Sequence, residues 1–358
     1  MKIESIRTTP VLAPLPCPLV TASGRIEQFP LVIIDVTTDT GIVGRSYTDT
    51  YLKELLPALD RTISGLGTLI AGMPLAPRDV FSFLNRRCRL MGMKNLVGVA
   101  IGGLDMAIWD AWSRAQNVPL VRALGGSPRP IRAYNSLGLY DAKSVVAAAE
   151  ETNVAGYAGM KVKTGFPTFA EDLACVRAAR KALKPDVALM IDYNQSLDPV
   201  EAMARCRALD GEGLEWIEEP VIADDFESCA RIASAVATPI QIGENFNGPG
   251  EMRAAMAANA MDLVMPDAQF IHGVSGWMEA ATLARSAGIP MSSHLFPEAS
   301  AHLLGVTPTA HWLEVMDVAG GLRSSPLPIV EGCVTAPEAP GFGIDWDDDA
   351  IARHRVSF

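Results

Sequence analysis

Beyond residue 130, short apolar segments alternate with alanine-rich segments of helical spacing. We interpret the apolar segments as strands at 131–136, 159–164, 188–194, 214–219, 239–244, 261–267, 290–295 and 311–315. They recur about every 20–30 residues, as expected of strand–helix units that close a barrel. The pattern therefore predicts an α/β fold, a (β/α)8 TIM-like barrel.

The preceding residues follow a different order, with strands first and helices after them. Residues 1–7 alternate like a strand, and 30–36 and 41–47 flank a turn, which predicts an antiparallel hairpin. Helical spacing follows at 52–71, 77–92 and 96–115. Strands followed by a block of helices indicate an α+β domain.

We therefore predict three parts of the chain. An N-terminal α+β capping domain spans 1–125, and the barrel spans 126–325. The C-terminal segment, 326–358, is rich in proline, glycine and aspartate, and we expect it to pack back on the capping domain.

Composition narrows the function classes. Hydrophobic residues make up 49% of the chain and charged residues 20%, which supports a large buried core. The net charge of −11 argues against a nucleic-acid partner, which needs a basic surface. No apolar run reaches the roughly 18 residues of a membrane span, and the N-terminus lacks a signal peptide. Six cysteines without a C-x-x-C pair indicate reduced thiols, so we expect a cytoplasmic protein.

Ionisable side chains stand at the carboxyl ends of the predicted barrel strands. They are Lys161, Lys163, Asp192, Glu218, Glu244, Asp267, His294 and Glu314. Taken singly, each has an ordinary explanation as a solvated edge, a helix N-cap or a structural histidine. In a barrel, however, these strand ends converge on one mouth, where catalysis occurs in this fold.

Converging carboxylates repel one another at low dielectric, and a bound cation removes that objection. Asp192, Glu218 and Glu244 follow three adjacent strands and offer hard oxygen ligands. Mg²⁺ prefers a few carboxylates while it keeps sites for water or substrate oxygen. The sequence therefore predicts Mg²⁺ as the cofactor.

As an ordered set, these strand ends resemble those of the enolase superfamily, specifically its mandelate racemase subgroup. The motifs that carry the resemblance are Lys161-Val162-Lys163, Asp192-Tyr193-Asn194-Gln195-Ser196, Trp216-Ile217-Glu218-Glu219-Pro220, Gly243-Glu244-Asn245, Pro266-Asp267-Ala268, Ser292-Ser293-His294-Leu295-Phe296 and His311-Trp312-Leu313-Glu314. The resemblance covers nearly the whole chain. Any one motif is weak, but the ordered set is highly specific.

The resemblance implies that Asp192, Glu218 and Glu244 bind Mg²⁺. It also implies that Lys163 is the base on one face of the substrate. Lys161 would lower the pKa of Lys163 and contact the substrate carboxylate. Lysines at i and i+2 of a strand point the same way and repel each other's charge, which favours the neutral form of one of them.

On the opposite face of the substrate, the resemblance implies a dyad of Asp267 and His294. Glu314 would stay protonated and donate a hydrogen bond to the carboxylate oxygen that gains charge. Asn194 and Ser136 would make further polar contacts with the substrate.

The sequence also departs from part of the family. Some relatives use a lysine on the sixth strand as the opposing base, but residues 267–273 contain no lysine. This departure favours His294 as that base. His272, His302 and His311 lie off the proposed mouth, and we expect structural roles for them.

A lysine and a histidine on opposite faces of one carbon can racemise it. The same pair can instead remove an α-proton and protonate a β-hydroxyl leaving group. We predict racemisation of a mandelate-like 2-hydroxy acid through an enediolate. The resemblance also implies a homo-oligomer, an octamer or smaller. Dehydration of an acid sugar to a 2-keto-3-deoxy acid is the alternative. A non-catalytic barrel is disfavoured, because every expected base and metal ligand is present.

Substrate choice is expected to depend on the capping loop 17–29 and on Tyr51. An apolar pocket for an aryl or alkyl group could be lined by Leu19, Val20, Ile26 and Met316. Arg25 and Glu27 suit a polyhydroxy substrate better, unless they face solvent.

Overall fold

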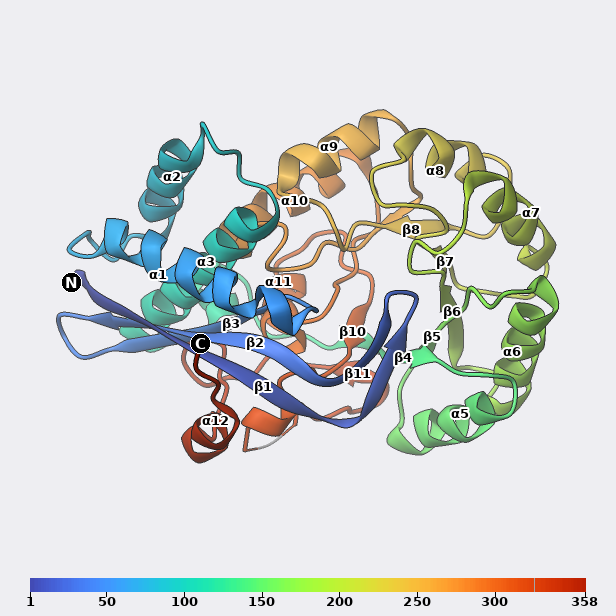
Figure 1. Cartoon of the computed structure of the whole chain (residues 1–358), viewed down its shortest axis with the longest axis horizontal. Coiled ribbons are helices and arrows are strands. Elements are labelled where there is room, and N and C mark those ends of the chain that lie inside the picture. Colours follow the sequence, from blue (N-terminus) through green and yellow to red (C-terminus); the bar gives the residue numbers. More distant parts are fainter. Residues whose placement is uncertain (325) are drawn as a thin grey trace.

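The computed structural model describes residues 1–324 and 326–358. An antiparallel sheet begins the chain, in the order β1 (Ile3–Thr21), β2 (Gly24–Thr38), β3 (Val43–Asp49). Residues 17–29, expected as a loop, instead end the β1–β2 hairpin, where Leu19 pairs with Ile26 after a register shift. Prolines before Leu19 remove backbone donors and mask this strand in the sequence. The hairpin arches over to the barrel (Figure 1).

The helices of the N-terminal part lie beside this sheet, and the two longest of them pack directly on it (Figure 1). They are η1 (Lys53–Leu55), α1 (Leu56–Ile70), α2 (Pro77–Cys88), α3 (Asn95–Ala115) and α4 (Leu120–Ala123). The middle of α3 is buried on nearly all sides. Its backbone lies so close to β3 that a Cβ on Gly44 would stand 2.2 Å from the carbonyl oxygen of Ala107. We call residues 1–125 the cap.

The rest of the chain forms a curled, mostly parallel sheet with helices outside it. The strand order is β10 (Leu313–Val315), β4 (Ile131–Leu139), β5 (Gly159–Lys163), β6 (Ala188–Asp192), β7 (Ile217–Glu218), β8 (Ile240–Ile242), β9 (Leu263–Val264). Single bridges from Met291 to Val264 and Ala310 join the two ends of the sheet. The strand predicted at 290–295 is thus reduced to isolated bridges. Leu295 and Phe296 adopt left-handed backbone angles, which ends the extended conformation.

Helices cover the outside of the curled sheet (Figure 1). They are α5 (Ser144–Ala155), α6 (Phe169–Ala182), α7 (Pro199–Leu209), α8 (Phe226–Ala233), α9 (Pro249–Ala257), α10 (Gly273–Ala287) and α11 (Pro297–Gly305). Among the described residues, no helix combines the length and the apolar character that a bilayer-crossing segment needs.

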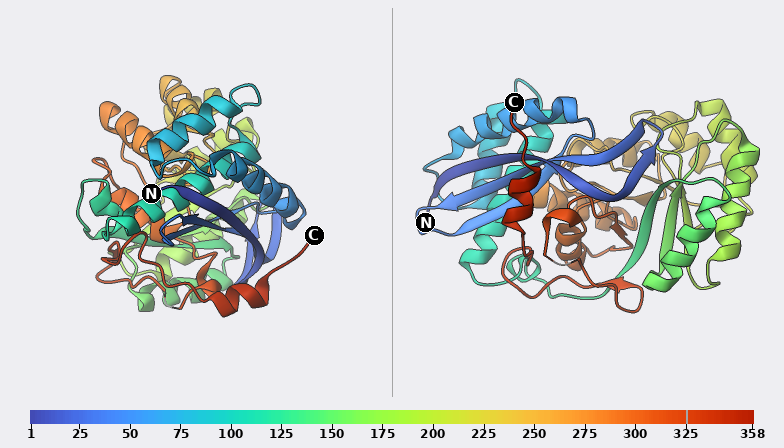
Figure 2. Two further views of the ribbon diagram at one scale, coloured as in Figure 1. Left: turned by 90° about the vertical axis from the view of Figure 1, so that its left-hand side faces the viewer. Right: turned by 60° about the horizontal axis from the view of Figure 1, so that its bottom comes forward.

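The C-terminal segment returns to both parts of the molecule. It contains β11 (Cys333–Val334) and α12 (Asp348–His354), and η2 (Gly320–Leu322) precedes it. β11 pairs antiparallel with β4, and Arg355 bridges to Val11 of the cap. Figure 2 shows α12 beside the cap sheet. The boundary predicted at 325/326 falls at Ser325, which lies outside the described residues.

A cap carboxylate holds the start of α10. Asp105 accepts hydrogen bonds from the backbone N–H of Ser275 (2.8 Å) and from its hydroxyl (2.7 Å). Trp109 Nε1 donates to the same hydroxyl at 3.0 Å. The N-cap residue of α10, His272, makes no side-chain cap of its own. A residue of the cap therefore satisfies donors at a barrel helix N-terminus.

The close contact at Gly44 gives a test of cap packing. Gly44→Ala forces a methyl group into the backbone of α3, and we expect the free energy of unfolding to fall by about 1–3 kcal/mol. Gly65→Ala is the control, because nothing lies within 4 Å of a Cβ there and alanine favours the helix. Chemical denaturation measures both. Equal stability of the two variants would contradict the packing.

Candidate active site

Three carboxylates meet at the mouth of the barrel. Asp192 ends β6, Glu218 ends β7 and Glu244 follows β8. One oxygen of each lies within 4.8 Å of the others, and all three side chains are buried. Three hard oxygen donors at this spacing fit a magnesium ion, which they could hold together while leaving positions for other oxygen ligands.

One tryptophan and one glutamine donate hydrogen bonds that hold Glu218 in this group. Trp216 Nε1 donates to Glu218 Oε2 at 2.8 Å, and Gln241 Nε2 donates to the same oxygen at 3.2 Å. The other oxygen, Oε1, accepts from Lys161 Nζ. The carboxylate is therefore held by the residue that precedes β7 and by neighbours from β5 and β8.

Lys161 and Lys163 alternate along β5 and point to the same side, as the sequence predicts. Lys163 Nζ donates to Asp192 Oδ2 at 2.5 Å. Lys161 Nζ lies deeper, and its distance to Glu314 Oε1 is 2.9 Å. Both ammonium groups are almost fully buried. The strand thus presents one lysine to the edge of the carboxylate group and one to the barrel centre.

The charge state of Lys163 differs from the expectation. Burial lowers the pKa of Lys163, but the carboxylates of Asp192 and Glu244 outweigh burial, and its pKa lies above the ordinary value. Lys161 does act in the expected, lowering direction. The effect of Lys161 on this pKa is smaller than that of the two carboxylates, so Lys163 is charged in this arrangement.

Asp267 and His294 form the expected pair. His294 Nδ1 lies 2.8 Å from Asp267 Oδ2, and His294 Nε2 lies 3.3 Å from Glu244 Oε2. Burial lowers the pKa of His294, but the carboxylates of Glu244, Glu314 and Asp267 raise it by more than burial lowers it. The resulting pKa is about 10. The imidazole is therefore protonated at neutral pH and directs Nε2 toward the carboxylate group.

The two basic groups approach the carboxylates from opposite ends. In strand order the carboxylates run Asp192, Glu218, Glu244. Lys163 contacts the first of them and His294 contacts the last. A ligand held by the three carboxylates would thus have an ammonium on one side and an imidazolium on the other.

The expectation that Glu314 stays protonated is wrong for this structure. Burial raises the pKa of Glu314, but Lys161 and His294 lower it more strongly, to about 2. Its Oε2 also accepts the backbone N–H of Leu295 at 2.7 Å. With two cationic neighbours and an amide donor, the ionised form is favoured.

The remaining expected substrate contacts surround this group. Ser136 is buried on β4, and among the described residues its hydroxyl has no hydrogen-bond partner. Asn194 has a left-handed backbone and donates its N–H to Asp192 Oδ1 at 2.6 Å. Tyr51 of the cap packs edge-on against Phe29, with ring centroids 5.4 Å apart.

The hairpin tip brings Leu19 and Ile26 to the barrel. A Cβ on Gly138 of β4 would lie 2.8 Å from the carbonyl oxygen of Val20, so the hairpin rests directly on this strand. Arg25 and Glu27 pair with each other at 3.4 Å, and their side chains are 58% and 74% exposed. These two charges face solvent.

Two of the histidines outside the dyad contact backbone carbonyl groups, and a third lies near a carboxylate. His272 Nε2 lies 2.8 Å from the carbonyl oxygen of Met93, and His302 contacts the carbonyl oxygen of Phe342 at 3.1 Å. His311 lies 3.7 Å from a carboxylate oxygen of Glu215. None of the three contacts the three carboxylates.

Sequence reasoning missed two buried polar residues, one near the dyad and one beside the three carboxylates. Asp49, at the end of β3, exchanges two hydrogen bonds with Gln269. β3 carries Arg45, Ser46 and Thr48 before Asp49, so Asp49 does not follow an apolar strand as the barrel carboxylates do. Glu219, beside Glu218, instead has a left-handed backbone and accepts from Gln195 at 3.0 Å.

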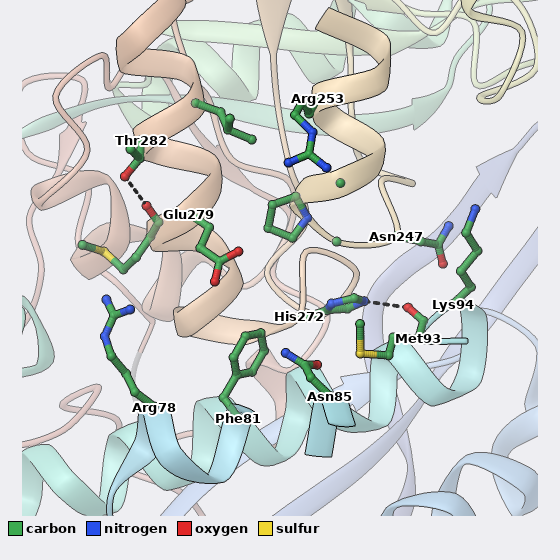
Figure 3. A pocket seen from close by; sticks show the side chains of 15 residues that line it. Arg78, Phe81, Asn85, Met93, Lys94, Asn247, Arg253, His272, Glu279 and Thr282 are labelled. Carbon is green, nitrogen blue, oxygen red and sulfur yellow. Dashed lines mark hydrogen bonds between the residues drawn. The ribbon is translucent and has the colours of Figure 1, made fainter. Parts of the chain in front are cut away.

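A separate cavity of about 560 Å³ lies between α2, α9 and α10. Figure 3 shows Arg78, Arg253 and His272 around it. The three carboxylates and both lysines of β5 are absent from its lining. It is therefore distinct from the mouth of the barrel.

The chain matches two family models that together span most of its length. Residues 3–125 match the mandelate racemase / muconate lactonizing enzyme N-terminal domain, and 144–350 match the enolase C-terminal domain-like family. The chain belongs to the enolase superfamily, in its mandelate racemase and muconate lactonizing enzyme group. The fold and the resemblance expected from the sequence are thus confirmed.

Individual relatives catalyse different reactions. The D-galactarolactone cycloisomerase of Agrobacterium fabrum is 29% identical, with 99% of each chain covered. The L-talarate/galactarate dehydratase of Salmonella typhimurium is 28% identical over 98% of this chain and 90% of its own. A Bradyrhizobium enolase, solved with magnesium and mandelic acid, is 42% identical with a TM-score of 0.96, and 99% of each chain is covered.

Metal binding is directly testable at this site. Calorimetric titration with Mg²⁺ should show one ion per chain, and Glu244→Gln should weaken its affinity by at least about tenfold, because one charged ligand is lost. Glu212→Gln is the control, since Glu212 pairs with Arg177 at 2.7 Å on the surface. Wild-type affinity in Glu244→Gln would exclude this carboxylate as a ligand.

Proposed function

We propose that the protein is a Mg²⁺-dependent racemase of a mandelate-like 2-hydroxy acid, acting through an enediolate. The observation that carries the proposal is the carboxylate group flanked by Lys163 at one end and the Asp267–His294 dyad at the other. The Bradyrhizobium relative solved with mandelic acid supports the substrate class.

Asp192, Glu218 and Glu244 would hold the magnesium ion. When bound, the ion would polarise the substrate carboxylate and, by its positive charge, favour the neutral form of Lys163. The proton next to a carboxylate is very weakly acidic, so a site that removes it must stabilise the extra charge of the enediolate.

Lys163 would take the α-proton on one face of the substrate. Its Nζ is held by Asp192, so the amine is positioned at the edge of the carboxylate group before substrate binds. Lys161 would donate to the substrate carboxylate oxygen that gains charge. Its ammonium, held by Glu218 and Glu314, is well placed to stabilise a negative oxygen in a buried site.

His294 would deliver a proton to the opposite face. Asp267 accepts from Nδ1, which leaves Nε2 facing the carboxylate group with a proton to donate. In the reverse direction neutral His294 would remove the proton and Lys163 would donate it. Glu314, being ionised, would act as the partner of Lys161 and would help to keep His294 protonated.

The cap would enclose the substrate and select its side chain. Leu19, Ile26 and Met316 are partly buried apolar residues that pack against the main core cluster. Arg25 and Glu27 face solvent, which removes the argument that they bind hydroxyl groups. An apolar cover supports a substrate with an aryl or alkyl substituent. Tyr51, Ser136 and Asn194 would contact the polar end of that substrate.

Dehydration of an acid sugar to a 2-keto-3-deoxy acid is the second candidate. The observation that favours it is the similarity to the L-talarate/galactarate dehydratase. Protonated His294 could donate its proton to a β-hydroxyl leaving group after Lys163 removes the α-proton. The catalytic groups would be the same, and only the substrate would differ.

Exchange with solvent deuterium tests the two bases. With Mg²⁺ and mandelate, wild type should incorporate deuterium at the α-carbon and interconvert the enantiomers. Lys163→Met should lose turnover by roughly 10²–10⁴-fold, because a positioned base is removed, while calorimetry still detects Mg²⁺ binding. Lys181→Met, on an exposed face of α6, is the matched control.

The outcomes separate the candidates. Failure of wild type on 2-hydroxy acids, together with 2-keto acid formation from acid sugars, would replace the racemase with the dehydratase. Full turnover in Lys163→Met would remove Lys163 from the mechanism altogether.

A further inference from the structure

A cap residue is hydrogen-bonded to the loop that carries Asp267, the carboxylate of the dyad. Gln269 lies two residues after Asp267 and is fully buried. Its side-chain Nε2 donates to Asp49 Oδ2 at 2.9 Å, and its Oε1 accepts the backbone N–H of Asp49, also at 2.9 Å. Both the nitrogen and the oxygen of the Gln269 amide are therefore hydrogen-bonded to Asp49, which is 220 positions away in the sequence.

The same glutamine is bonded to the dyad through its backbone. The N–H of Gln269 donates to Asp267 Oδ1 at 2.7 Å, and the N–H of Phe270 donates to the same oxygen at 3.2 Å. The other oxygen of Asp267 faces His294 Nδ1. Continuous hydrogen bonds therefore connect Asp49 of the cap to the imidazole of His294.

The helix α3 presses on the same loop from a second direction. A Cβ on Gly102 would lie 2.2 Å from the carbonyl oxygen of Gln269, and a Cβ on Gly273 would lie 2.6 Å from Asp105 Oδ2. The backbone from 267 to 273 is thus held between β3 and α3, so a change at Asp49 has little room to be absorbed by loop movement.

Simple packing does not account for an acid at position 49. Its side chain is 2% exposed, and among the described residues Oδ1 has no hydrogen-bond partner. A buried carboxyl without full compensation is costly. Burial and, next, the nearby charge of Asp267 raise the pKa of Asp49 to about 8. Asp49 therefore lies close enough to the dyad to interact with its charge.

We propose that Asp49 is a positioning residue for the histidine face of the site. Through Gln269 it fixes the orientation of Asp267, and Asp267 in turn fixes the ring and the proton of His294. The inference rests on the proposed racemase for its kinetic consequence, but the hydrogen-bond coupling can be measured without turnover. Partners one step removed from a reacting group commonly change activity by about 10–100-fold.

The kinetic experiment follows deuterium exchange from each mandelate enantiomer separately, with saturating Mg²⁺. In Asp49→Ala, exchange of the proton that faces His294 should slow by about 10–100-fold. Exchange of the proton that faces Lys163 should stay within about threefold of wild type. Asp49→Asn keeps an acceptor for Gln269 and should restore both rates. Equal slowing of both exchanges, or no recovery in Asp49→Asn, would overturn the proposal.

Asp105→Asn is the structural control. Asp105 is another buried cap carboxyl, and it contacts the start of α10 rather than the dyad. The substitution should lower the melting temperature without a bias between the two exchange directions. Gln269→Met serves if Asp49→Ala does not fold, because it removes both side-chain bonds to Asp49 and leaves the backbone N–H on Asp267. It should reproduce the one-sided loss.

A spectroscopic measurement separates this inference from the proposed function. In protein labelled with ¹⁵N-histidine, the Nδ1–H proton of His294, assigned by its loss in His294→Asn, reports its bond to Asp267. We expect this resonance to shift upfield or broaden in Asp49→Ala and to be unchanged in Asp105→Asn. If wild type racemises nothing yet the shift occurs, only the proposed function fails. An unchanged resonance in Asp49→Ala overturns the positioning role.

Discussion

The structure depends on how four buried carboxylates are neutralised at one end of the barrel. Asp192, Glu218, Glu244 and Glu314 lie nearly or completely out of water, where isolated charges are very unfavourable. Lys161, Lys163 and His294 stand among them and contact them directly. The ionised Glu314 and the protonated His294 both follow from this mutual neutralisation. These four carboxylates and Asp267 outnumber the three cations, and a divalent cation where Asp192, Glu218 and Glu244 converge would offset the excess of negative charge.

The barrel and the cap contribute different things to this arrangement. The strand ends place the charged groups, because parallel strands bring their carboxyl ends to one rim. The cap covers that rim with its β1–β2 hairpin and holds the β9–α10 loop through β3 and α3. A curled sheet alone would leave the acids open to water, and a charged group in water exerts a much weaker field than one in a buried site. Enclosure is therefore part of the electrostatics of the site.

Much of the fold and the three carboxylates of the carboxylate group could be predicted, because both depend on local patterns in the sequence. Alternation of apolar and helical segments indicated the barrel, and one acid after each of three strands indicated the carboxylate group. Properties that depend on distances could not be predicted. Two lysines on one strand suggested a lowered pKa for Lys163, but the 2.5 Å contact with Asp192 reverses the direction. The strand expected at 290–295 was lost to the left-handed backbone of Leu295 and Phe296. The pairing of Asp49 with Gln269 has no local signal at all.

The pairing across 220 positions has a consequence for how the site is formed. Asp192, Glu218 and Lys163 belong to adjacent strands of one sheet, so their geometry is set as soon as that sheet forms. Asp267 belongs to a loop whose backbone is in contact with the cap on two sides. The lysine face thus depends on the barrel alone, whereas the histidine face also depends on the docking of the cap. The two faces are therefore secured by different parts of the molecule, and of these cap–barrel contacts it is the pairing of Asp49 with Gln269 that reaches the histidine face.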